Sequence, residues 1–198
     1  LVGKQVDYDL VDHINLGKCT VQNGKLVSPS GEEYTSIVIP YTTALYSETV
    51  LKLLEAANAG VKVVVIGTDE IACETGKSEV AAKWSEILDK AEYATSENGA
   101  ANILRKDGHT YVKLSDAYAE NIFTSKRENS NYSVFTFVNA YGEDKTYDFE
   151  LYADGKNVKY YNAVTGQITE VKASFENGAA KFNFKLPANT TGFFVIER

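Results

Sequence analysis

The sequence predicts an α/β domain followed by an all-β domain, because composition and hydrophobic pattern both change near residue 120. All nine phenylalanines lie at or after Phe123, and seven of the thirteen tyrosines lie at or after Tyr118. Residues 1–117 carry 11 basic and 17 acidic groups, whereas residues 118–198 carry 9 and 10. Apolar strands alternate with helical stretches before this point, and only short strands follow it. We therefore expect two domains, over residues 1–120 and 121–198, joined through the polar stretch 124–131.

The first domain has the order expected of a parallel sheet with crossover helices. The expected elements are a strand over 34–40, a helix over 47–59, a strand over 61–66 and a helix over 78–91. Pro40 ends the first strand because it has no N–H, and Gly60 stops the first helix. The β-branched run at 61–66 is typical of a strand buried on both faces in a parallel sheet.

Smaller elements complete this domain. An acidic strand is expected near Tyr8–Val11, and a hairpin is expected to turn at Asn23-Gly24. A second hairpin is expected over Asn102–Leu114, with its turn at Asp107-Gly108. The domain is therefore predicted to be a small α/β layer, flavodoxin-like in outline.

The second domain consists of short strands at regular spacing. The expected strands cover residues 132–138, 146–152, 157–162, 168–173, 180–186 and 192–197. Glycine-containing turn signals separate them, as at Asp154-Gly155 and Asn177-Gly178. Such spacing is typical of an antiparallel β-sandwich.

One hairpin of this domain can be given a register. If Asp154-Gly155 forms a two-residue type I′ turn, Leu151 faces Val158 on one surface and Glu150 faces Lys159 on the other. Apolar pairs on one face and an opposite-charge pair on the other are what a half-buried hairpin requires.

Composition limits the classes of partner. The net charge of −7 argues against nucleic acid, which requires a clustered basic face. The longest apolar run falls far short of the roughly 20 residues that a membrane helix needs, so no span is expected. The two cysteines, Cys19 and Cys73, are expected to be buried or half-buried thiols, although a bridge between them stays open. The localisation is not predicted.

The chemistry-bearing residues form no convincing catalytic or cofactor site. Glu74–Ser78 lies where a phosphate-binding loop would lie, but Ile71 occupies the position that requires the first glycine. Cys73 lacks the flanking glycines of a nucleophile elbow, and the histidines, His13 and His109, are far apart. Nothing singles out a pair among the 27 acids for glycoside hydrolysis. We therefore predict no catalytic residue, no metal ligand and no cofactor.

Two tyrosines are candidate contacts for a carbohydrate. In the hairpin register described above, Tyr152 and Tyr161 share the outer face, away from the core. An exposed tyrosine ring can present an apolar face to a sugar. The alternative is that these rings are ordinary strand residues or pack on the other domain.

The sequence also resembles a known family, the bacterial α-L-rhamnosidase-like glycoside hydrolases of the family 106 type. The segments that carry the resemblance are 7–11, 23–26, 34–40, 59–63, the set Arg127, Phe135, Phe137 and Asn139, and the hairpin 161–166. In that hairpin the chain keeps an aromatic residue and Thr165-Gly166 but lacks the family's Asp and Pro. The motifs are loose, and β-galactosidase-type enzymes share some of them.

The resemblance implies a non-catalytic C-terminal portion, because the catalytic carboxylates of such enzymes lie in an upstream barrel. The chain begins at Leu1 and contains no Met, so we expect a piece of a longer polypeptide. The leading hypothesis is an accessory segment of a glycosidase, with the upstream catalytic domain as its partner. The alternatives are a carbohydrate-binding module acting through the sandwich on an oligosaccharide, and a small stand-alone α/β enzyme built around Cys73 or Glu74.

Overall fold

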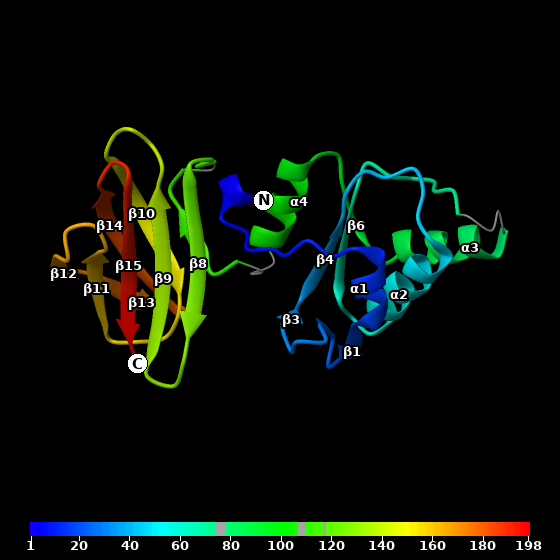
Figure 1. Cartoon of the computed structure of the whole chain (residues 1–198), viewed down its shortest axis with the longest axis horizontal. Coiled ribbons are helices and arrows are strands. Elements are labelled where there is room, and N and C mark those ends of the chain that lie inside the picture. The colour runs from blue at the N-terminus through cyan, green and yellow to red at the C-terminus, as the bar shows by residue number, and fades with distance from the viewer. Residues whose placement is uncertain (74–77, 107–109, 117) are drawn as a thin grey trace. The chain divides into compact units, whose positions relative to one another are not determined.

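The chain forms two compact units, which we call the helix–strand unit and the strand unit (Figure 1). The computed structural model describes residues 1–73, 78–106, 110–116 and 118–198. The helix–strand unit is Asp9–His109, and the strand unit combines Leu1–Tyr8 with Thr110–Arg198. Each unit has its own buried apolar core. The fold therefore contains both helices and several antiparallel sheets, and the strand unit is discontinuous in sequence.

A parallel three-stranded sheet organises the helix–strand unit. Its strands are β4 (Ser36–Ile39), β5 (Lys62–Ile66) and β6 (Glu92–Ala94), in that order. Helix α2 (Ser47–Asn58) connects β4 to β5, and α3 (Ser78–Leu88) connects β5 to β6. The predicted strand–helix–strand–helix order is therefore confirmed, because parallel neighbours need such crossovers.

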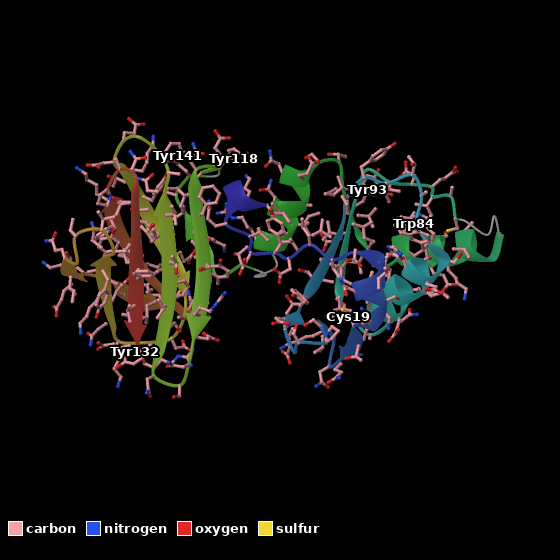
Figure 2. All side chains as sticks on the ribbon, in the orientation of Figure 1. Cys19, Trp84, Tyr93, Tyr118, Tyr132 and Tyr141 are labelled. Carbon is pink, nitrogen blue, oxygen red and sulfur yellow. The ribbon has the colours of Figure 1, made fainter. Side chains whose placement is uncertain are left out.

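The middle strand of this sheet is buried on both faces. Val63 and Val65 belong to the core that Leu53 of α2 and Trp84 of α3 also line. Trp84 (Figure 2) is 3% exposed, and its indole N–H donates to the carbonyl of Asp69 after β5. Because side chains alternate along a strand, the buried Val64 points to the opposite face of the sheet.

A helix replaces the hairpin expected over residues 102–114. Helix α4 (Glu97–Lys106) begins where the Ser96 hydroxyl accepts a hydrogen bond from the Gly99 N–H at 3.1 Å, a typical N-cap contact. It contacts β5 and β6 and buries Ala100, Ala101 and Leu104. The expected turn at Asp107-Gly108 lies outside the described residues.

The N-terminal part of this unit contains one confirmed hairpin. Asn23 and Gly24 have φ of 51° and 74° and join β1 (Thr20–Gln22) to β2 (Lys25–Val27), as a type I′ turn requires. Strand β3 (Glu33–Tyr34) pairs with β2.

The strand expected near Tyr8–Val11 is absent. Residues 8–11 are irregular and pair with no strand. The Leu10 side chain is therefore 92% exposed, since no neighbouring strand covers it. Helix α1 (His13–Lys18) follows, and the carboxylate of Asp12 caps it by accepting from the Asn15 N–H at 2.9 Å.

The strand unit consists of two antiparallel sheets around one core. The first sheet contains, in spatial order, β12 (Ile168–Val171), β11 (Asn157–Asn162), β15 (Thr190–Glu197), β9 (Tyr132–Asn139) and β8 (Ile122–Glu128). The second contains β13 (Ser174–Glu176), β14 (Ala179–Leu186), β10 (Lys145–Tyr152) and β7 (Val112–Leu114). Phe149 of the second sheet lies 5.3 Å from Phe137 and 5.1 Å from Phe194 of the first, between ring centroids. Inward side chains of the two sheets therefore share one core.

The polar stretch expected to link the two domains is mostly strand β8. It pairs with β9 from Ile122 to Glu128. Ile122 is its fully buried residue, and Glu128 forms ion pairs with Lys126 at 2.8 Å and Arg198 at 2.9 Å. Charged side chains are suited to a sheet edge, because they discourage pairing with another strand.

The hairpin expected at Asp154-Gly155 does not form. Strand β10 pairs with β14 and β7, whereas β11 pairs with β12 and β15, so the segment crosses from one sheet to the other. Neither residue has the positive φ of a type I′ turn. A Cβ on Gly155 would lie 2.3 Å from the Ile196 side chain, so this glycine serves close packing against β15. The predicted pairing of Glu150 with Lys159 is also wrong, since Glu150 lies opposite Lys181.

The N-terminal residues complete the strand unit. The 3-10 helix η1 (Val2–Lys4) contacts β8, and the carbonyl of Gly3 accepts a hydrogen bond from the Ala119 N–H at 2.7 Å. Gln5 is 2% exposed, and its side-chain amide donates to the carbonyls of Gly3 and Ala119. Because β7 pairs with β10, the compact units divide after His109 and not after residue 120.

We predict that Gly192→Ala destabilises the strand unit. A Cβ on Gly192 of β15 would lie 2.3 Å from the Tyr160 ring. This ring is buried and contacts the rings of Phe184 and Phe194. Overpacking of this kind costs about 1–3 kcal/mol in the free energy of unfolding. Urea unfolding followed by far-UV circular dichroism measures the loss.

The matched control for this prediction is Gly142→Ala. No heavy atom lies within 4 Å of a Cβ at Gly142, and its φ is not in the left-handed region. Its free energy of unfolding should change by less than about 0.5 kcal/mol. Equal changes in the two variants would contradict the close contact between Tyr160 and β15.

Candidate functional site

The two tyrosines proposed as sugar contacts lie on different sheets. Tyr152 ends β10 in the second sheet, and Tyr161 lies in β11 of the first. Their neighbours Leu151 and Tyr160 are buried, so both rings point outward from the core. The expected shared face is therefore wrong, because it depended on the hairpin at Asp154-Gly155.

The surroundings of these two rings also differ. The ammonium group of Lys113 lies over the Tyr152 ring, 5.1 Å from its centroid, as a cation–π contact. Tyr161 is half-buried between its cross-strand neighbours Phe193 and Ile168. One face of Tyr152 is thus occupied by a side chain of the same sheet.

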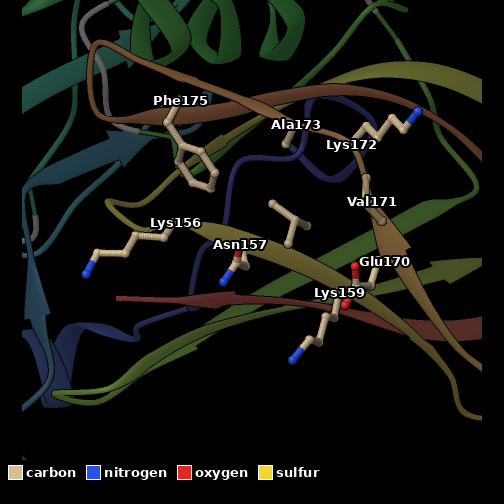
Figure 3. A pocket seen from close by; sticks show the side chains of 9 residues that line it. Lys156, Asn157, Lys159, Glu170, Val171, Lys172, Ala173 and Phe175 are labelled. Atoms are coloured by element: carbon tan, nitrogen blue, oxygen red, sulfur yellow. The ribbon is translucent and has the colours of Figure 1, made fainter.

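A separate feature of the strand unit is a pocket, which we call the edge groove (Figure 3). Its cavity volume is about 490 Å³. It lies at the ends of β11, β12 and β13, where the chain passes from the edge strand of one sheet to the edge strand of the other. The residues that line the edge groove are Lys156, Asn157, Val158, Lys159, Glu170, Val171, Lys172, Ala173 and Phe175.

The floor of the edge groove is apolar. Val158 is 3% exposed and belongs to the core of the strand unit. Val171, Ala173 and Phe175 are partly buried and pack against that core. The Phe175 ring, carried by β13, points toward the middle of the groove (Figure 3). The groove therefore exposes the margin of the core, including one aromatic face.

The rim of the edge groove is rich in lysine. Three of the lining residues are lysines, and one, Glu170, is acidic. Lys159 forms an ion pair with Glu197 at 2.8 Å. Among the described residues, Lys156 and Lys172 form no ion pair. Both of these side chains are exposed.

The electrostatics of the groove centre on the Lys159–Glu197 pair. The pKa of the Glu197 carboxyl lies below its usual range, mainly because Lys159 donates a hydrogen bond to it and secondly because Asn157 does. The same contact with Glu197 raises the pKa of Lys159. Both groups are therefore charged at neutral pH.

Sequence reasoning missed the edge groove because it placed Lys156 and Lys159 in the wrong hairpin. The register that forms the groove pairs Val158 with Val171 and Lys159 with Glu170. One signal in the sequence could have indicated the groove. Lys156 and Lys159 precede the turn that begins at Asn162, and Lys172 follows it, so a hairpin about this turn brings the three lysines to one end. That turn joins β11 to β12, and the Asn162 side chain accepts hydrogen bonds from the N–H groups of residues 164 and 165.

Asn139, one of the residues that carried the family resemblance, has a structural role. Its side chain is 1% exposed and donates to the carbonyl of Pro187 at 2.9 Å. It also accepts from the Tyr141 N–H at 3.0 Å. Asn139 therefore joins the loop after β9 to the loop before β15, and its polar atoms are held by the fold.

No disulfide joins Cys19 and Cys73. Cys19 is buried, donates to the carbonyl of Asn15 at 3.3 Å, and has a pKa raised by burial. Cys73 is half-buried against the core of the helix–strand unit. The bridge that the sequence left open is thus not formed.

The remaining sequence candidates are separated or lie outside the described residues. The His13 ring stacks on Tyr46 with centroids 4.2 Å apart, whereas Glu74–Lys77 and His109 are outside the description. Within the described ranges, no three His, Cys, Asp or Glu side chains gather as a metal site. Within the same ranges, no helix has the length and apolar character needed to cross a membrane.

Solved structures that resemble this chain are glycoside hydrolases. The rhamnosidase from Novosphingobium sp. PP1Y has a TM-score of 0.68 and 17% sequence identity, covering 92% of this chain and 19% of that one. The α-L-fucosidase isoenzyme 2 from Paenibacillus thiaminolyticus has a TM-score of 0.51 and 11% identity, covering 83% and 41%. No family model and no curated protein matches the sequence. At these identities the likeness is one of fold, and the chain spans about a fifth of the rhamnosidase.

We predict that the Glu197 carboxyl titrates below its ordinary pKa and that Lys159→Gln raises this pKa. Because the pKa is lowered by folding, the pair stabilises the fold above the unfolded pKa of about 4.3 and loses its effect as pH falls through the folded pKa. NMR titration of the side-chain carboxyl measures the change. Lys185→Gln, which removes a lysine paired with Asp144, is the control and should leave Glu197 unchanged. An unshifted Glu197 in the native chain would contradict the pairing.

Proposed function

We propose that this chain is a non-catalytic accessory segment of a glycoside hydrolase, with a flavodoxin-like α/β domain and a β-sandwich domain. Its partner is a catalytic domain of the same polypeptide, which it supports. The observation that carries the proposal is the likeness to the rhamnosidase, which runs through 92% of this chain and both of its units but spans 19% of that enzyme.

The construction of the two units agrees with a supporting role. Each unit fills its own core with apolar side chains, so each can hold its shape without a bound cofactor. The chain also passes between the units twice, at residues 8–9 and 109–110, because the strand unit contains the N-terminal residues. Two covalent connections therefore join the units.

A second candidate function is carbohydrate binding through the β-sandwich. The edge groove favours it, because this groove combines a partly buried aromatic ring with polar and charged side chains at its rim. Binding pockets for small molecules commonly pair an apolar lining with a few polar groups in this way. Tyr161 lies two residues from Lys159 on β11 and is proposed as a further sugar contact. Tyr152 belongs to the other sheet, so it would contact a sugar separately from the edge groove.

We predict that the purified chain has no glycosidase turnover. Aryl α-L-rhamnosides, α-L-fucosides and β-galactosides should release no phenol above the rate in buffer, because an accessory segment carries no catalytic carboxylate pair. A colorimetric assay is sensitive enough, since working enzymes typically turn over about 1–1,000 times per second.

Contamination and true activity can be separated in this assay. Turnover that elutes with the chain through two chromatographic steps and falls in a single carboxylate variant would contradict the accessory role. Such activity would instead favour the stand-alone enzyme.

A further inference from the structure

We propose that the edge groove binds an anionic saccharide, one whose sugar rings carry carboxylate or sulfate groups. The inference rests on the second candidate function, carbohydrate binding, and names its ligand class. It comes from the groove's shape, its aromatic face and the two lysines at its ends.

The size and floor of the groove suit a short oligosaccharide. The cavity volume of about 490 Å³ lies within the roughly 300–1,000 Å³ typical of small-molecule sites. Val171 and Phe175 are only partly buried and offer apolar surface to the C–H face of a sugar ring, and covering that surface removes it from water.

The charges of the groove are not distributed evenly. Both acidic groups lie beside Lys159. Glu170 is its cross-strand neighbour, and Glu197 forms an ion pair with it at 2.8 Å. Lys156 and Lys172 lie at opposite ends of the groove, as Figure 3 shows. The free positive charge is therefore at the two ends, although the whole chain has a net charge of −7.

This distribution favours an anionic ligand over a neutral one. A lysine ammonium is a compact point charge with three donors, and its hydrogen bonds to an ionised oxygen are about twice as strong as neutral ones. A neutral sugar would contact Phe175 but leave the charges of Lys156 and Lys172 without a partner. A saccharide with negative groups on successive rings offers a charged partner to more than one lysine.

The test is isothermal titration calorimetry of the full chain with three ligands. They are trigalacturonate, a sulfated carrageenan tetrasaccharide and neutral galactotriose, each at about 20 mM and 200 mM NaCl. We expect one or both anionic ligands to bind and galactotriose to bind at least tenfold more weakly. Binding should weaken at the higher salt concentration, because the rim lysines are exposed to solvent. The carboxylated and sulfated arms identify which anion the lysines accept.

Matched variants locate the binding. Lys156→Gln and Lys172→Gln should each weaken anionic binding about fivefold, whereas Lys185→Gln, on another part of the strand unit, should not. Phe175→Leu keeps apolar volume but removes the ring, and it should weaken all saccharides alike. The unfolding midpoint of each variant is measured alongside, so that a loss of fold is not taken for a loss of contact.

The contrary outcomes separate the two proposals. Equal affinity for galactotriose and the anionic ligands, with loss in Phe175→Leu, would overturn the anionic preference and leave carbohydrate binding in place. Anionic binding that Tyr161→Ala abolishes and both lysine variants retain would also overturn it, because the site would then be the outer face of the sheet. No heat with any ligand would overturn both, while the accessory role depends on the turnover assay alone.

Discussion

The strand unit depends on the packing of the Phe194 ring between its two sheets. Phe194 lies in the first sheet, 5.4 Å from Phe137 of the same sheet and 5.1 Å and 4.9 Å from Phe149 and Phe182 of the second, between ring centroids. Edge-on and tilted contacts of this kind stabilise more than area burial alone. They also decide the alternation of each strand, since Phe149 can reach Phe194 only if its neighbours point outward. The edge groove is where this core ends, at Phe175.

Local patterns predicted much of the fold correctly. In the predicted strand 180–186, Phe182, Phe184 and Leu186 alternate with polar residues, and these three side chains are buried or half-buried in β14, because a period-two pattern records which face is inside. Asn177-Gly178 forms a true two-residue turn, with φ of 53° and 73°, between β13 and β14. The β-branched run before Ile66 is the middle strand of the parallel sheet. In these places local and tertiary preferences agree.

The failures arose where tertiary contacts override local signals. Asp154-Gly155 has the composition of a hairpin turn, but inter-sheet packing draws the chain across to β15, and the glycine is needed for that approach. Strand β8 is polar because it lies at a sheet edge, so its sequence is like that of a linker. The edge groove depends on this crossing and on a second one, from β12 to β13, so its residues could not be assembled from the sequence. Its lysines and Phe175 come from β11, from β13 and from the segments just before β11 and just after β12, and β12 and β13 belong to different sheets.

The most direct measurement is the unfolding of Phe194→Ala followed by two probes. Trp84 is the sole tryptophan and lies in the helix–strand unit, so its fluorescence reports on that unit, whereas far-UV circular dichroism includes the strands. Removing a buried phenylalanine ring costs about 3–5 kcal/mol. The account predicts a loss of that size in the strand transition and a smaller change in the Trp84 transition, because the two cores are separate. A loss below about 1 kcal/mol, or equal shifts of both probes, would contradict it.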